Sequence, residues 1–359
     1  MGTVVLMNIG IVVGTRPHVG KIYSLQKAVR ELAGNCCLLH TNQHYDYEMQ
    51  QLLFDELGYA PDEILQKYRI GNAIDWVMEM INRYELDFIF LQGDSAPALV
   101  GSVAAIYSGI GIGHMESGLR ANDTLMIEER NRVMVDSASH YLFCYCEEHA
   151  ENLRKSKYFR GKIFVVGNPT VDLIDEIRPR LHILERAPYI YVTIHRRELT
   201  EDYLMLCEVL EGIAQASRQL SLDIIFPIHP RTRQAFANFG IDPRTYLGSK
   251  AELLPPVSMI DSLSYVANAR IIVTDSGCIQ EEACILNTPC VTVRQNTERP
   301  ETLRVGANIL SECSKMNIVH SVLRANEIPV NWKHPYGNGS AARDAVEIVM
   351  TSYNSIRNY

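Results

Sequence analysis

Acidic side chains follow several of the apolar runs in the first half of this sequence. Asp94 comes directly after FIFLQG, and Glu116 and Glu128 lie in the charged stretch HMESGLRANDTLMIEERNR at residues 114–132. Carboxylates that meet in a closed cleft raise one another's pKa and become usable as general acids or bases. A solvated or ion-paired role is the simpler interpretation for each residue alone. Their common place after apolar runs favours acid–base chemistry.

Basic side chains accompany these acids. Arg120 and Arg132 belong to the same charged stretch. Arg16 and Lys21 follow the first apolar run in GTRPHVGK, a glycine turn that matches neither the phosphate loop of NTPases nor the dinucleotide-binding fingerprint. A structural ion pair is as compatible with Arg16 as a phosphate contact.

The second half carries a matching set of polar motifs. THRRE places His195 and Arg196 after an apolar run, where they could neutralise a leaving phosphate, and IHPRTR adds His229 and Arg231. TDSGCIQEEA at residues 274–283 predicts a strand, a Ser-Gly turn and a helix. The first-turn N–H groups of that helix can hold a phosphate, and a first-turn carboxylate can bind ribose hydroxyls. Simple capping of the helix is the alternative.

Composition excludes several classes of protein. A hydrophobic content of 47% and a charged content of 21% indicate a globular protein, and the net charge of −8 argues against general nucleic-acid binding. The nine cysteines form no CxxC pair and lie mostly in apolar runs, which favours reduced core residues of a cytoplasmic protein. No set of side chains has metal-ligand spacing and no stretch suits a membrane span, so we expect no metal, no cofactor and no membrane contact.

The apolar runs predict the architecture. Their continuous hydrophobicity, alternating with segments of helical period, indicates parallel strands that are buried on both faces. In the first half we expect strands at residues 8–14, 36–41, 88–93, 109–115, 141–146 and 163–167, and helices at 22–32, 73–84 and 96–108. The pattern restarts after the proline-containing residues 168–188, with strands at 189–195, 224–229, 251–256, 270–275 and 289–294.

The sequence therefore predicts an α/β protein with two doubly wound, Rossmann-like domains. We place them at residues 1–172 and 173–339, and we assign a last helix at 340–359 to the first domain. Ligands of such sheets bind outside the carboxyl ends of the strands. Because the charged motifs of both halves fall at those ends, we expect both domains to face one shared cleft.

Taken together, these motifs resemble a known family. GTRP, TNQHYDYEM, QGDS, HMESGLR, EERNR, THRRE, PIHPRTR, TDSGCIQEEA and TERPE follow the order of the non-hydrolysing UDP-N-acetylglucosamine 2-epimerases, from about residue 8 to 310. The resemblance implies a glycosyltransferase-B architecture, a homodimer, and interconversion of UDP-GlcNAc and UDP-ManNAc by elimination and re-addition of UDP through a 2-acetamidoglucal. It implies catalytic roles for Asp94, Glu116, Glu128 and His195.

The same resemblance implies the residues that bind the UDP-sugar. They are Arg16, Lys21, Arg120, Arg132, Arg196, His229, Arg231, Ser276, Gly277, Cys278, Glu282 and Arg299. Among them, Ser276 and Gly277 fall on the diphosphate cradle and Glu282 on the ribose contact. In this interpretation Arg120 and Arg132 orient Glu116 and Glu128 towards the sugar or keep them ionised.

The sequence departs from the family pattern at four places. His18 stands where the family has glutamate, Ile127 replaces a proline, and Cys278 replaces the second glycine of Ser-Gly-Gly. The segment between Tyr68 and Trp76 is shorter than usual. These differences concern the exact sugar and the family's second, activating UDP-GlcNAc site. Another UDP-2-acetamido sugar, such as a diacetamido or uronic derivative, therefore stays an alternative substrate.

Three further functions stay open. They are the hydrolysing branch that releases ManNAc and UDP, a glycosyltransferase with the same two domains, and a catalytically inactive nucleotide-sugar sensor. The intact THRRE and EERNR motifs favour the non-hydrolysing branch. The sequence shows no apolar or basic face for an acceptor, as a transferase would need. An inactive sensor should have lost a key carboxylate, and none is missing.

Overall fold

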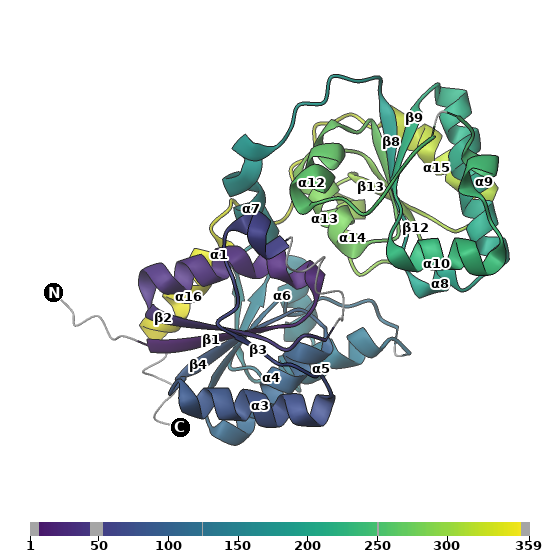
Figure 1. The fold of residues 1–359 in the computed structure, drawn as a ribbon. Coiled ribbons are helices and arrows are strands. Elements are labelled where there is room, and N and C mark those ends of the chain that lie inside the picture. The colour runs from purple at the N-terminus through teal and green to yellow at the C-terminus, as the bar shows by residue number, and fades with distance from the viewer. Residues whose placement is uncertain (1–6, 44–52, 124, 250, 353–359) are drawn as a thin grey trace. The chain divides into compact units, whose positions relative to one another are not determined.

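The computed structural model describes residues 7–43, 53–123, 125–249 and 251–352, except for the side chains of Arg16 and Pro17. The chain divides into two compact units: unit 1 comprises Met1–Arg178 and Tyr336–Tyr359, and unit 2 comprises Pro179–Pro335 (Figure 1). Each unit is a parallel sheet with helices on both faces. The predicted α/β class with two doubly wound sheets is therefore confirmed.

The sheet of unit 1 has the strand order β3-β2-β1-β4-β5-β6-β7. Its strands are β1 (Met7–Val13), β2 (Gly34–His40), β3 (Glu63–Ile64), β4 (Phe88–Gln92), β5 (Gly111–Met115), β6 (Tyr141–Cys144) and β7 (Lys162–Val165). Its helices are α1 (Arg16–Leu32), α3 (Ile70–Arg83), α4 (Ala96–Ser108), α5 (Ile127–Ala138), α6 (Glu147–Arg154), α7 (Pro169–Ile177) and α16 (Ala341–Ser352).

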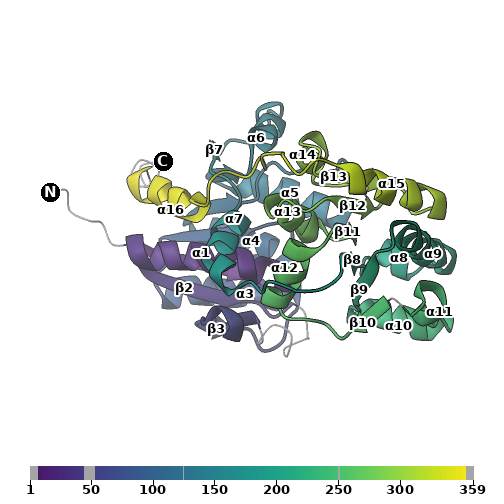
Figure 2. The ribbon, with the colours of Figure 1, turned by 90° about the horizontal axis from the view of Figure 1, so that it is seen from above.

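Two layers of helices cover this sheet. Helices α1, α7 and α16 pack together on one face, and α3, α4 and α5 pack together on the other (Figure 1). Figure 2 shows α16 beside α1, so the last described helix returns to the unit in which the chain starts. Strands β4 and β5 are buried at every position, which accounts for their mostly apolar sequence.

The sheet of unit 2 has the strand order β10-β9-β8-β11-β12-β13. Its strands are β8 (Tyr189–Thr193), β9 (Asp223–Pro227), β10 (Ala251–Leu254), β11 (Ile271–Thr274), β12 (Cys290–Val293) and β13 (Asn308–Ser311). Its helices are α8 (Arg197–Thr200), α9 (Tyr203–Leu220), α10 (Pro230–Phe239), α11 (Pro243–Leu247), α12 (Met259–Asn268), α13 (Gly277–Ile285), α14 (Pro300–Arg304) and α15 (Lys315–Glu327). Alternate residues of β8 enter two separate cores, one under α9 and α15 and the other under α12 and α13.

The observed elements differ from the predicted ones at several places. Helix α1 begins six residues before the predicted start at residue 22, because Pro17 suits the first helical turn. Gly109, predicted as the start of a strand, instead ends α4 in the left-handed conformation with a φ of 69°. The short strands β3 and β13 were not predicted.

Other global features concern only the described residues. Among them, no helix is long and apolar enough to cross a membrane, and no group of three acidic, histidine or cysteine residues is arranged to hold a metal ion. All nine cysteines are free thiols. Burial raises the pKa of Cys36 and of Cys37 to about 12, so these thiols stay protonated at neutral pH.

Candidate functional site

The carboxyl ends of β1, β4 and β5 bring the polar residues of unit 1 together. These strands are adjacent in the sheet, and the strand order reverses between β1 and β4. Ligands of doubly wound sheets bind at such a reversal. Asp94 follows β4, Glu116 follows β5, and Lys21 lies in the second turn of α1, the helix after β1.

Glu116 is the most deeply enclosed of the three predicted carboxylates. Only 3% of it is exposed. Its Oε2 accepts hydrogen bonds from Lys21 Nζ at 3.0 Å, Gln92 Nε2 at 2.9 Å and Tyr145 Oη at 3.1 Å. Three donors on one oxygen, one of them an ammonium group, favour the ionised carboxylate in this buried place.

Asp94 is held by α5. Arg132 is almost fully buried and donates from Nη2 to Asp94 and from Nη1 to Glu129, the latter at 2.7 Å. Glu129 in turn accepts backbone N–H bonds from Ala121 at 2.9 Å and Asn122 at 3.4 Å. The side chain of Asp94 remains 21% exposed. It is therefore paired with a buried cation but still accessible to a ligand.

The structure corrects two predicted pairings. Arg120 does not orient a glutamate, because its guanidinium donates to Asp136 at 2.6 Å. Arg132 bonds Glu129 rather than Glu128, which is exposed in the first turn of α5. The physical reason is the helical period: Glu129, Arg132 and Asp136 are three and four residues apart and share the inward face of α5.

His18 lies between the turns that follow β1 and β4. Its Nδ1 is 3.1 Å from Thr15 Oγ1 and 3.3 Å from Ser95 Oγ. A Cβ added to Gly93 would meet its Nε2 at 2.5 Å, so the ring lies directly against the turn that carries Asp94. Where the resemblance implies a glutamate, this chain has an imidazole, which removes one carboxylate from the neighbourhood of Asp94.

In unit 2, Asp275 organises the residues that follow the adjacent strands β8 and β11. It is fully buried, its Oδ2 accepts the backbone N–H groups of His195 and Arg196 at 2.8 Å each, and its Oδ1 lies 3.3 Å from His195 Nδ1. A carboxylate on one ring nitrogen orients the imidazole and favours its charged form. The ring of His229 lies 5.2 Å from that of His195, and Arg231 donates to the His195 carbonyl at 2.9 Å. The His195 side chain is 32% exposed and can therefore meet a ligand.

Helix α13 begins beside a buried cluster of opposite charges. Glu298 is 3% exposed and pairs with Arg196 at 2.8 Å and with Arg294 at 2.6 Å. A Cβ added to Gly277 would approach Glu298 Oε1 to 2.7 Å, so this carboxylate lies against the first residue of the helix. Helix N-termini favour anions through their N–H groups and the macrodipole. A phosphate bound here would compete with Glu298 for Arg196.

The remaining predicted residues are placed less centrally. Arg299 is buried and paired with Glu281. Cys278 and Glu282 lie half-buried in the first two turns of α13. Arg16 begins α1, and its side chain lies outside the described residues. Residues 44–49 of the motif TNQHYDYEM, which follows β2, also lie outside them.

Five buried site residues have no role in the sequence analysis, although three of them belong to the motifs QGDS, HMESGLR and TERPE. They are Gln92, His114, Asp136, Tyr145 and Glu298, and each is buried and bonded to a neighbour in these clusters. Two of them, Gln92 and His114, are polar residues inside strands that are otherwise apolar. Because buried polar groups need partners, a polar residue in such a strand is a signal that could have identified them.

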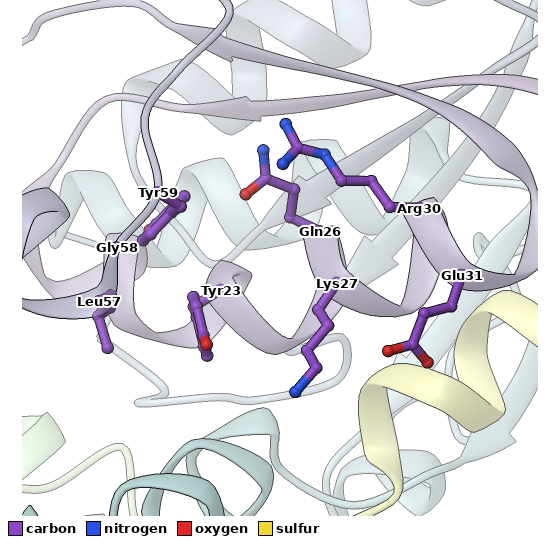
Figure 3. Close-up of a pocket in the computed structure, with 8 residues that line it drawn as sticks. All are labelled: Tyr23, Gln26, Lys27, Arg30, Glu31, Leu57, Gly58 and Tyr59. Atoms are coloured by element: carbon purple, nitrogen blue, oxygen red, sulfur yellow. The ribbon is translucent and has the colours of Figure 1, made fainter.

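A groove of about 310 Å³ lies along α1 and contains none of the predicted site residues (Figure 3). It is lined by Tyr23, Gln26, Lys27, Arg30, Glu31, Leu57, Gly58 and Tyr59. Lys27 pairs with Glu176 at 3.0 Å and Arg30 lies 3.7 Å from Asp62, so both cations of the groove already have carboxylate partners. We therefore assign the chemistry to the strand ends.

A family model, a relative and a solved structure agree in what this chain resembles. The family model described as UDP-N-acetylglucosamine 2-epimerase matches residues 27–350. A UDP-N-acetylglucosamine 2-epimerase of Methanococcus maripaludis is 37% identical over 363 residues, which cover 96% of this chain and 98% of the relative. The crystal structure of the Methanocaldococcus jannaschii UDP-GlcNAc 2-epimerase in complex with UDP-GlcNAc and UDP is similar with a TM-score of 0.89 at 34% identity, covering 96% of this chain and 100% of the other.

A relative with a different named substrate is also similar. The UDP-2,3-diacetamido-2,3-dideoxy-D-glucuronate 2-epimerase of Pseudomonas aeruginosa is 29% identical over 329 residues, covering 88% of this chain and 91% of the relative. The reaction type in these names is the same, and the sugar differs.

Proposed function

This chain belongs to the UDP-N-acetylglucosamine 2-epimerase family, and we propose that it interconverts UDP-GlcNAc and UDP-ManNAc without net hydrolysis. The observation that carries the proposal is Glu116, a buried carboxylate that receives three hydrogen bonds on one oxygen. It follows the strand next to the one that ends before Asp94. Such a pair is what a proton transfer at carbon requires.

The chemistry explains why two carboxylates are needed. The proton at C2 of the sugar is weakly acidic, so a base must be held against it in a place that excludes water. Inversion at C2 also needs a proton delivered to the opposite face. Asp94 and Glu116 are held by different cations, Arg132 and Lys21, which supports two independent acid–base groups. We assign removal and return of the proton to this pair, and Glu128 to a further contact with the sugar.

The residues of unit 2 suit the leaving group. When the C2–H electrons form the C1–C2 double bond, the C1–O bond breaks and UDP leaves as an anion, which gives 2-acetamidoglucal. We propose that the departing diphosphate binds to the start of α13 and to Arg196. The guanidinium of Arg196 would then leave its ion pair with Glu298 and pair with phosphate. His195, oriented by Asp275, neutralises the same charge. UDP then adds back to C1 as the proton returns to the other face of C2.

The proposal requires the acids of unit 1 and the anion-binding residues of unit 2 to act on one bound substrate. Further UDP contacts are assigned to Ser276, Cys278, Glu282, His229, Arg231 and Arg299, as the resemblance implies. Arg16 joins them on the same ground.

Incubation with UDP-GlcNAc in deuterated water tests the function. We expect UDP-ManNAc with deuterium at C2, and deuterium in the recovered UDP-GlcNAc, both seen by proton NMR. Release of free ManNAc with UDP would identify a hydrolysing enzyme instead. Absence of both exchange and product would contradict the proposal.

Matched variants connect the activity to the site. Asp94→Asn, Glu116→Gln and His195→Asn should each lower turnover by about 10²-fold or more, because each removes an acid–base or charge-neutralising group. Glu252→Gln, which alters an exposed carboxylate paired with Arg186, should leave turnover unchanged. Near-normal turnover in one of the three variants would remove that residue from the mechanism.

A second substrate is favoured by one observation. His18 replaces the glutamate of the family pattern and lies against the turn that carries Asp94. Loss of that carboxylate would ease binding of a sugar with its own carboxylate. The deuterium experiment should therefore be repeated with UDP-2,3-diacetamido-2,3-dideoxy-D-glucuronate, and a higher kcat/KM for this sugar would establish it as the substrate.

A further inference from the structure

His114 lies fully buried in β5 between two hydrogen-bond acceptors. Its Nδ1 is 2.7 Å from Asp136 Oδ1, and its Nε2 is 2.9 Å from the carbonyl oxygen of Gly93. A carbonyl oxygen can only accept, so Nε2 carries a hydrogen. A ring with a bare Nε2 would place two lone pairs against each other without water to relieve them.

The partner on the other side is an ionised carboxylate. Burial alone would raise the pKa of Asp136, but hydrogen bonds and charge from His114 and Arg120 outweigh it and hold the pKa below its ordinary value. Asp136 Oδ1 therefore accepts as well, and Nδ1 of His114 also carries a hydrogen. Both ring nitrogens donate, which makes the ring a buried cation that is stabilised by a charge-assisted hydrogen bond.

This buried group connects the two turns that carry the proposed acids. Gly93, which holds the Nε2 side, has a φ of 70° and directly precedes Asp94. On the Nδ1 side, Asp136 Oδ2 accepts Arg120 Nη2 at 2.6 Å and the backbone N–H of Gly118 at 3.3 Å. His114 is itself two residues before Glu116.

We propose that His114 is a positioning residue, held as a doubly protonated ring, that fixes the turn of Asp94 and the turn of Glu116 relative to one another. It does not touch substrate, since none of its surface is exposed. Its role in turnover rests on the proposed function. Its protonation state is independent of that function, so each of the two experiments below can contradict one part of the proposal without affecting the other.

The protonation is tested on the unaltered full-length protein with ¹⁵N-labelled histidine. At neutral pH we expect one histidine whose two ring nitrogens both bear slowly exchanging hydrogens, and we expect this signal to vanish in His114→Gln. His140 is the internal reference: its Nδ1 accepts the backbone N–H of Ile112 at 3.1 Å, so its ring carries one hydrogen only. A single hydrogen on the His114 ring would overturn the proposed state.

The positioning role is tested by kinetics. His114→Gln and Asp136→Asn should lower kcat by about 10- to 100-fold and change KM by less than about threefold, because displacement of the acids by about 1 Å affects the reaction more than binding. His140→Gln should leave both constants unchanged. Unaltered kcat in a folded His114→Gln enzyme would overturn the role. If the unaltered protein itself shows no C2 exchange, the proposed function fails while the NMR result still decides the protonation.

Discussion

At the scale of single residues, Glu116 is held in a backbone conformation that its residue type disfavours. Its φ of 74° lies in the left-handed region, which costs an L-residue with a Cβ about 1–2 kcal/mol. The three hydrogen bonds to Oε2 offset this cost and keep the carboxylate aimed at Lys21. The turn conformation and the buried ion pair therefore depend on each other.

Lys21→Met should show this dependence as a loss of stability. Both partners are at least 95% buried, and removing one member of a buried pair leaves an uncompensated charge that costs about 3–5 kcal/mol. We expect a loss of this size in the free energy of unfolding, measured with urea and circular dichroism. Adding Glu116→Gln to the variant should restore part of it, because the unpaired charge disappears.

Lys27→Met is the matched control for this variant. Its pair with Glu176 is 51% and 34% exposed, so its removal should cost at most about 1 kcal/mol. Equal losses in the free energy of unfolding of the two lysine variants would show that the buried Lys21–Glu116 pair contributes no more to stability than the exposed pair.

The types of residue at the strand ends follow from the sequence, but their partners do not. Charged motifs after apolar runs predict that Asp94 and Glu116 each follow a strand, and the fold shows that these two strands are neighbours. The partner of Arg120 is sixteen residues away on another element, and no local pattern contains that distance. The helical period of α5 could have predicted that Arg132 pairs with Glu129 and not with Glu128, because Glu129 and Arg132 lie three residues apart on the inward face of the helix.

At the scale of elements, burial on both faces made most strands predictable and short edge or polar strands unpredictable. Strand β4 is apolar from Phe88 to Leu91 because every residue in it is buried, and its last residue, Gln92, is the polar exception. Strand β13 contains Asn308, whose amide is buried and bonded to Thr292 and Gln280, so its sequence lacks that run. Tertiary hydrogen bonds, which no sequence window reports, replace hydrophobicity there.

The end of β2 gives a pH-dependent prediction. His40 is 2% exposed and packs edge-on against Phe54, and burial lowers its pKa to about 4 from 6.5. The unfolded chain therefore binds this proton first as the pH falls. The contribution of His40 to stability is complete above pH 6.5 and is lost between pH 6.5 and about 4, at a total of about 3 kcal/mol.

His40→Gln removes this titration. We expect the free energy of unfolding of the unaltered protein to fall more steeply than that of the variant as the pH drops from 6.5 to 4. The difference in slope corresponds to the uptake of up to one additional proton on unfolding. Urea unfolding at half-unit pH steps measures the difference. Parallel curves across that interval would contradict the lowered pKa.

At the scale of the whole molecule, the chain passes between the units twice, after Arg178 and before Tyr336. Within unit 1, the segments that lead to these two places contact each other. The backbone N–H of Asn168 donates to the carbonyl of Tyr336 at 2.9 Å. A Cβ on Gly167, which has a φ of 96°, would approach that carbonyl to 2.7 Å. Only glycine allows so close an approach here. Residues so far apart in sequence meet only in the fold, and periodicity could place the last helix but not its neighbours.

Asp172 extends this junction into α16, and its loss should loosen that helix selectively. Its two carboxylate oxygens accept the backbone N–H groups of Ala341 at 3.2 Å and Ala342 at 3.0 Å, so a residue of α7 caps α16. Asp172→Ala should cost about 1–2 kcal/mol, the usual price of a lost cap. Hydrogen exchange read by mass spectrometry should show faster exchange in α16, while the strands of unit 2 keep their protection.

Asp175→Ala tests whether this effect belongs to the cap. Asp175 lies in the same helix and is 49% exposed. Its carboxylate pairs with Arg178 and lies beside Gly339, but no described N–H group of α16 donates to it, so we expect no change in the exchange of α16. Faster exchange in both variants would mean that α7 as a whole, rather than the Asp172 cap, holds the last helix. Faster exchange throughout unit 2 in Asp172→Ala would mean that the two units do not open independently.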